Sequence, residues 1–247
     1  MRGAGAVAGL DALFGGRVVP NLPAGADGIR AGRRTGAAGG LALTVHGEGG
    51  HGARPHEAVD AIWIAARVVT ELQQTIARRL DALQPVVISF GRIEGGRAFN
   101  VITDRVRLLG TVRCLDLALH ERLPGWIEET VQGICQAAGG DADVRYRCIA
   151  PPVHNDPELT ALMERCAVER LGCSRVVAVE QPSLGAEDFA ELLRDVPGTM
   201  LRLGVAGSQG CAPLHHCRFD PDEASLPVGI AVLTATLQAW MLERQTP

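Results

Sequence analysis

The stretch LALTVHGEGGHGARPHEAVDAIWIAARVVTELQQTIARRL, residues 41–80, decides how this chain folds. Its apolar start at 41–45 predicts a strand, and the glycine-rich segment 47–52 predicts a turn after it. Apolar residues then recur every three or four positions up to residue 80, which indicates a long amphipathic helix. We expect this helix to bury one face, made of Val59, Ile62, Trp63, Ala66, Val69, Leu72, Ile76 and Leu80.

The next seventy residues continue the alternation of strands and helices. Residues 85–93 and 104–114 are rich in β-formers and are separated by the turn Glu94-Gly95-Gly96. A helix is expected over 118–137 and a last strand over 144–149, and the helix should bury Leu119, Leu123, Ile127, Val131 and Ile134. The order β-α-β-β-α-β predicts a two-layer α/β sandwich over residues 41–150.

The two flanks of this unit are incomplete on their own. Residues 1–40 contain short strand and loop signals without a core of their own, and Pro151-Pro152 marks a boundary. The C-terminal flank alternates helices and strands, expected at 157–171, 176–179, 186–195, 200–205 and 225–243. We therefore predict that 1–40 and 151–247 form one α/β layer structure, interrupted by the 41–150 unit.

Composition excludes several classes of protein. With 247 residues, 47% of them hydrophobic, the chain can bury a core, which excludes intrinsic disorder. The net charge is −4 and all 24 basic residues are arginine, with no basic stripe among aromatics, so nucleic acid is not an expected partner. We see no uninterrupted apolar run of about 18 residues, and expect no membrane partner. Seven scattered cysteines without a secretory leader predict a cytoplasmic protein with free thiols.

Three residues of the 41–150 unit are candidates for substrate chemistry. His51 stands between glycines on a loop after a strand, where an imidazole can polarise a carbonyl group; the alternative is a solvated histidine in a turn. Asn100 and Arg113 could bind a substrate carboxylate, Asn100 by its amide and Arg113 by its guanidinium. Taken singly, both residue types are more often structural.

The segment Cys211-Ala-Pro-Leu-His215-His216-Cys217 concentrates soft metal ligands in the C-terminal flank. Its spacing matches no structural zinc motif, so we expect His215 to supply a single ligand to a larger site. Glu187 could add a carboxylate or could cap a helix. The absence of a G-x-S-x-G, P-loop or H-E-x-x-H motif gives no support to a serine hydrolase, a nucleotide-binding protein or a zincin.

Taken together, these segments resemble the M20 metallopeptidases, and within them the amidohydrolases of N-acyl amino acids, hippurate and auxin conjugates. The resemblance runs over nearly the whole chain, although Thr103 stands where the family has proline. The matching segments follow in the family's order, at 11–15, 18–25, 47–60, 95–102, 110–113, 186–189, 197–198 and 214–220.

The resemblance implies a fold, a site and a partner. The flanks would be a remnant of a metal-binding α/β catalytic domain, and 41–150 would be its lid, through which two subunits pair as a homodimer. His51 would stabilise the oxyanion in the active site of the second subunit, Asn100 and Arg113 would hold the carboxylate of an N-acyl amino acid, and His215 would bind metal. The family implies two divalent ions, zinc or manganese.

The chain also departs from the family pattern. The family's C-G-H-D-x-H segment and its Glu-Glu pair would lie upstream of Met1, as in an N-terminally truncated member, and Arg17 stands where a metal-binding histidine is expected. A guanidinium has no lone pair for a metal. We therefore expect that this chain alone does not bind the two ions and does not hydrolyse amides. Apolar faces left uncovered by the missing strands predict a dimer or larger assembly.

Three functions remain open at this stage. The first is an amidohydrolase completed by another segment or chain, and the second is a non-catalytic descendant that binds ligand or partners as a dimer. The third is an enzyme that uses Cys211 or Cys217 as nucleophile beside His215 or His216. Metal content and selective thiol alkylation distinguish the three.

Overall fold

The computed structural model describes residue 5 and residues 7–245, so Met1 lies outside the described residues. It divides into an outer unit (Met1–Thr35, Val153–Ser183 and Glu187–Pro247) and an inserted unit (Gly36–Pro152 with Leu184–Ala186). The inserted unit begins five residues before the predicted residue 41 and ends two residues after the predicted residue 150. Its first strand starts at Ala37, ahead of the apolar run that we used to define it.

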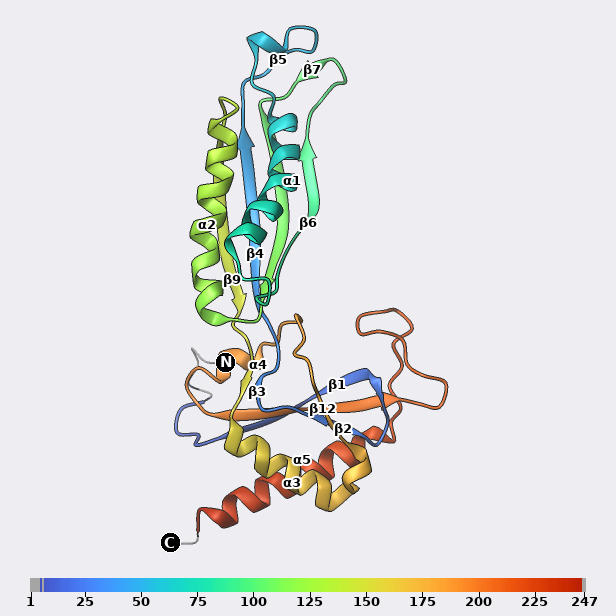
Figure 1. Cartoon of the computed structure of the whole chain (residues 1–247). Coiled ribbons are helices and arrows are strands. Elements are labelled where there is room, and N and C mark those ends of the chain that lie inside the picture. Colours follow the sequence, from blue (N-terminus) through green and yellow to red (C-terminus); the bar gives the residue numbers. More distant parts are fainter. Residues whose placement is uncertain (1–4, 6, 246–247) are drawn as a thin grey trace. The chain divides into compact units, whose positions relative to one another are not determined.

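The inserted unit is a four-stranded antiparallel sheet with two helices, as Figure 1 shows. The strand order is β6-β8-β4-β9, which leaves β6 and β9 at the two edges. This confirms the mixed α/β fold and the predicted β-α-β-β-α-β order. The elements are β4 (Ala37–His46), α1 (Ala61–Arg79), β6 (Val86–Gly95), β8 (Arg105–Cys114), α2 (Leu117–Gln136) and β9 (Asp141–Ala150).

The core of this unit lies between the sheet and the helices. Helix α2 buries all five residues predicted from its periodicity. The prediction for α1 was wrong for three residues, because Ile62 and Trp63 are 46% and 51% exposed and Ala66 is exposed as well. Asp60 caps the helix through the backbone N–H groups of Ile62 and Trp63 and so fixes where the first turn begins. The face that packs combines two alanines with larger aliphatic residues: Ala61, Ile64, Ala65, Val68, Leu72 and Ile76.

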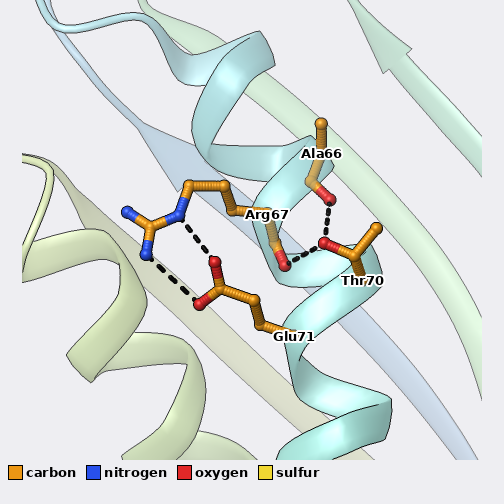
Figure 2. Close-up of polar contacts among 4 residues, drawn as sticks. All are labelled: Ala66, Arg67, Thr70 and Glu71. Atoms are coloured by element: carbon orange, nitrogen blue, oxygen red, sulfur yellow. Dashed lines mark hydrogen bonds and ion pairs between the residues drawn. The ribbon is translucent and has the colours of Figure 1, made fainter.

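The solvent face of α1 carries its own polar contacts (Figure 2). Arg67 donates from Nε and Nη2 to the two carboxylate oxygens of Glu71, at 2.8 and 3.2 Å. The Thr70 hydroxyl donates to the carbonyl oxygens of Ala66 and Arg67, both at 3.1 Å. The Arg67 guanidinium also lies 5.1 Å from the centre of the Trp63 ring. Exposed Trp63 is thus held in a defined position on the helix surface.

The outer unit is built on a mixed sheet with the order β1-β12-β2-β11. Strands β1 and β12 are parallel, whereas β2 runs antiparallel to β12 and parallel to β11. The elements of this unit are β1 (Leu13–Pro23), β2 (Asp27–Ile29), β3 (Gly32–Arg33), β10 (His154–Asn155), α3 (Pro157–Leu171), β11 (Val176–Ala178), α4 (Phe189–Leu192), β12 (Gly198–Ala206) and α5 (Ser225–Glu243). Helices α3 and α5 match the predicted ranges.

Two predictions for this unit were wrong. Residues 13–23 form one strand of eleven residues, not separate short strands, because β12 pairs along its length from Gly198 to Ala206. The helix expected over 186–195 is reduced to Phe189–Leu192. Asp188 makes no side-chain cap there, and Glu187 forms an ion pair with Arg17 instead of starting a helix.

The two faces of the β1-β12 pair differ in what covers them. Leu201, Leu203 and Val205 pack in the apolar core with residues of α3 and α5. A Cβ placed on Gly16, the partner of Leu201, would meet Leu201 and Leu233 of α5. A Cβ on Gly15 would instead meet Phe189 of α4 at 3.2 Å. Helices α3 and α5 therefore cover one face of the β1-β12 pair, and the short helix α4 lies on the opposite face.

Helix α5 is, among the described residues, the one helix long and apolar enough to cross a membrane. No segment of this kind was expected from the sequence, because we saw no uninterrupted apolar run of about 18 residues. Within the outer unit α5 packs against α3, β1 and β12, and its Trp240 ring meets Phe14 edge-on at 6.1 Å. Its outer side remains apolar and exposed, at Leu226, Ile230, Leu237, Met241 and Leu242.

Candidate functional site

His51 and Asn100 lie side by side at one end of the inserted unit. The short strands β5 (Gly50–His51) and β7 (Val101–Ile102) pair there, with His51 opposite Val101. Gly52 N–H donates to Asn100 O at 2.9 Å, and a Cβ on Gly52 would lie 2.8 Å from that oxygen. The loop therefore needs glycine at residue 52 to hold the two candidates together.

The His51 ring is exposed and oriented by its own loop. Its Nδ1 accepts a hydrogen bond from Ala53 N–H at 3.1 Å. An accepting Nδ1 places the proton of the neutral ring on Nε2. Nε2 is therefore a hydrogen-bond donor toward solvent, which is the arrangement needed to polarise a carbonyl oxygen or stabilise an oxyanion.

Arg113 lies far from Asn100 within one copy of the chain. It follows Arg105 by eight residues along β8, which corresponds to about 27 Å at about 3.4 Å per residue. Asn100 precedes the start of β8. Because β8 lies between them, one copy of the chain does not bring the two side chains to one carboxylate, and their joint role stays a prediction that requires two copies.

The surroundings of Arg113 include a polar pair that the sequence analysis missed. Arg113 is half-buried and donates from Nε to the Thr111 hydroxyl at 3.1 Å. Nearby, the Tyr146 hydroxyl lies 2.8 Å from Nε2 of buried His120. Burial raises the pKa of Tyr146, which Arg113 opposes. Tyr146 is the single tyrosine of the chain, and that was the signal available in the sequence.

His215 lies in an exposed loop of the outer unit, with a left-handed φ of 66°. The described residues contain no group of three or more His, Cys, Asp or Glu side chains placed to hold a metal ion. The neighbouring thiols have hydrogen-bonding neighbours of their own. His216 Nδ1 already accepts from Arg218 N–H at 3.0 Å and lies 4.0 Å from the Cys217 sulfur, and Cys211 donates to Asp220 O at 3.3 Å.

Arg17 occupies β1 and forms an ion pair with Glu187. The Glu187 side chain is only 12% exposed, and that of Arg17 is 33% exposed. A guanidinium has no electron pair for a metal, and the carboxylate that could bind one is engaged by it. The donors present in this part of the chain therefore do not fit a pair of divalent ions.

Comparison with known proteins finds a matching family domain and several similar hydrolases. Residues 34–143 match the M20 peptidase dimerisation domain. A protein of Synechocystis described as a probable hydrolase is 48% identical over 239 residues, covering 96% of this chain and 61% of the relative. The N-acetyldiaminopimelate deacetylase of Geobacillus is 35% identical over 223 residues, covering 90% of this chain and 58% of the relative.

A solved structure shows the same fold. The YXEP protein of Bacillus subtilis, described as a dinuclear metal-binding peptidase from the M20 family, aligns with a TM-score of 0.79 and 27% identity. The alignment covers 98% of this chain and 60% of that protein. The chain thus spans about three fifths of the length of the relatives it matches.

Proposed function

Because this chain belongs to the M20 peptidase family, we propose that it carries the substrate-binding lid of an amidohydrolase of N-acyl amino acids or related amide conjugates. The deacetylase relatives support this substrate class, since an N-acetylated amino acid is named in their function. We propose further that these 247 residues alone do not hydrolyse the amide bond.

The ion pair between Arg17 and Glu187 carries this second part of the proposal. Zinc or manganese needs imidazole, thiolate or carboxylate donors that are free to bind. Arg17 offers none and neutralises the nearby carboxylate, and among the described residues His215 belongs to no group of three or more side chains placed to hold a metal ion. We therefore propose no metal-dependent step for this chain, and assign it ligand binding.

The residues of the inserted unit support binding and orientation of the ligand. His51 presents Nε2–H to the acyl carbonyl oxygen, and the exposed Asn100 amide stands beside it. Arg113 binds the ligand's carboxylate with its guanidinium. Because Asn100 precedes β8 and Arg113 lies about 27 Å along that strand from Arg105, one small ligand meets both only when they come from two copies of the chain.

The exposed edge of the inserted unit supports pairing as a homodimer. Strand β6 has one unpaired edge, and α1 lies over it. Ile93 of β6 and the residues Ile62 and Trp63 of α1 are 57%, 46% and 51% exposed. Ile93 pairs with buried Leu108, so its side chain points to the same sheet face as the helices. We propose that a second copy covers this strip.

Metal content measured with turnover and binding tests the proposal. We expect less than stoichiometric zinc and manganese, no hydrolysis of N-acetyl amino acids, and calorimetric binding of an N-acetyl amino acid that is lost in Arg113→Leu. Arg145→Leu, which removes an exposed arginine of the same unit, should leave binding unchanged. Two tightly bound ions per chain together with turnover would show that the chain is a complete hydrolase.

A further inference from the structure

The β1-β12 pair places two arginines beside each other on one face of the outer sheet. Arg17 and Arg202 are direct neighbours in the parallel register. Neighbouring residues of paired strands point to the same side, and Leu201, the residue before Arg202, points toward the helices. Arg17 and Arg202 therefore lie on the face opposite α3 and α5.

A third arginine is buried behind them. Arg34 follows β3 and is only 2% exposed. Its Nη2 donates to Leu201 O at 3.0 Å, and Arg202 in turn approaches Arg34 O at 3.5 Å. We call Arg17, Arg34 and Arg202, with the carboxylate of Glu187, the arginine cluster.

The charges of the cluster do not balance. The pKa of Arg34 is lowered to about 10, chiefly by burial and then by Arg202 and Arg17, against an opposing contribution from Glu187. At neutral pH Arg34 therefore still carries its proton. Burial, with a contribution from Arg30, also lowers the pKa of Arg202. Three guanidinium groups thus share one carboxylate, which leaves two positive charges on a partly buried face.

Arg30, which lies near Arg202, does not reduce the net positive charge of this region. It donates from Nη1 to the carbonyl oxygens of Val179 and Glu180 and from Nε to Arg33 O. These acceptors are backbone carbonyls, which do not remove the charge of Arg30. Uncompensated charge at partly buried positions costs stability, and an anion that binds there recovers part of that cost.

We propose that the arginine cluster binds a multivalent oxyanion, carried by free phosphate or by a dicarboxylate. Arg17, one-third exposed, and half-buried Arg202 offer the contacting N–H groups, whose fork geometry suits oxygen pairs. Arg34 adds a fixed positive charge from behind. The cluster shares the Arg17–Glu187 pair with the proposal that this chain binds no metal ion, but anion binding there does not depend on ligand binding by His51, Asn100 and Arg113.

Glu187 makes the proposal sharply testable, because it competes inside the protein for the same guanidinium. Its carboxylate holds Arg17 Nη1. Replacing it by glutamine removes one negative charge from the cluster and frees Arg17. Glu187→Gln should therefore bind the anion more tightly than the unmodified chain, an effect that a folding defect does not produce.

Calorimetric titration of the whole chain with sodium phosphate and with sodium succinate, at constant ionic strength in chloride, is the experiment. We expect at least one anion to bind, about tenfold more weakly in Arg202→Gln and several-fold more tightly in Glu187→Gln. Arg175→Gln, which removes an exposed arginine of the outer unit, is the control and should bind like the parent. The anion that binds more tightly identifies the source of the oxyanion.

Three results would overturn the proposal. The first is that neither anion binds, and the second is that Arg175→Gln weakens binding as much as Arg202→Gln. The third is that Glu187→Gln leaves the affinity unchanged or lowers it while circular dichroism shows a native fold.

Discussion

Replacing Asp27 by asparagine should remove a pH dependence from the stability of the outer unit. Asp27 lies in β2, is fully buried, and neither of its carboxylate oxygens has a hydrogen-bond partner in the described part of the chain. Its register partner Leu203 belongs to the core that α3 and α5 cover. Burial in this apolar setting raises the pKa of Asp27 from 3.8 to about 6.

The sign of the effect follows from proton linkage. Between the two pKa values the folded chain holds the Asp27 proton and the unfolded chain has lost it, so the free energy of unfolding falls as pH rises. Stability is highest for this group below 3.8 and is lost as pH passes through about 6. The full difference corresponds to about 3 kcal/mol, of which about 2 kcal/mol falls between about pH 4 and about pH 7.

Urea unfolding of the parent chain and of Asp27→Asn, at several pH values in this range, measures the effect. A buried asparagine has unsatisfied groups of its own, but that cost does not depend on pH and cancels in the comparison. The variant should therefore gain about 2 kcal/mol relative to the parent as pH rises from about 4 to about 7. Asp188→Asn, which removes an exposed carboxylate of the same unit, is the control and should show no such trend. A stability difference between Asp27→Asn and the parent that stays constant with pH would refute the reasoning.

Three further predictions concern the inserted unit. Trp63→Glu should shift the chain from dimer to monomer in sedimentation. Leu83→Glu, at a residue 89% exposed, is the control and should not. Equal dimer dissociation constants for the two variants would exclude the exposed surface of α1 and β6 as the interface. Gly39→Ala places a Cβ 2.0 Å from the Tyr146 hydroxyl and should lower the free energy of unfolding by about 1–3 kcal/mol, and adding Tyr146→Ala should make the Gly39 substitution nearly neutral in a double-mutant cycle. His51→Ala should weaken the binding of an N-acetyl amino acid about tenfold in calorimetry. The unfolding midpoint should not change, because the ring is exposed. Unchanged affinity would show that His51 does not contact the ligand.

The elements that could be predicted are those with local causes. The helix at Pro157–Leu171 begins after Asp156, whose side chain accepts from Leu159 N–H, and ends at Gly172 with φ 84°. Both signals are visible in the sequence, since acidic caps and glycine stops act on the neighbouring turn. The buried face of α2 was predictable for the same reason: a single apolar stripe leaves one way to pack.

The elements that could not be predicted depend on partners distant in the chain. Helix α1 carries two overlapping apolar stripes, and packing against the sheet and α2 selected the one that contains Ile64 and Val68, leaving Trp63 outside. The helix expected at 186–195 begins only at Phe189. Before it, Glu187 forms an ion pair with Arg17, which lies 170 residues earlier in the chain. The candidate site was recognisable by residue type at His51, Asn100, Arg113 and His215, but the distances among those residues were not.

The sequence by itself determined the alternation of helices and strands, the resemblance to the M20 peptidases, and the residue types of the candidate site, because each is encoded in short-range pattern and spacing. Tertiary structure alone decided that Arg17 pairs with Glu187 and that Arg34 and Asp27 are buried charged or titratable groups. It also decided that the length of β8 lies between Asn100 and Arg113. The physical reason is that charge balance and distance are properties of strands brought together by the sheet, and residues that share a face of it can be more than a hundred positions apart in the chain.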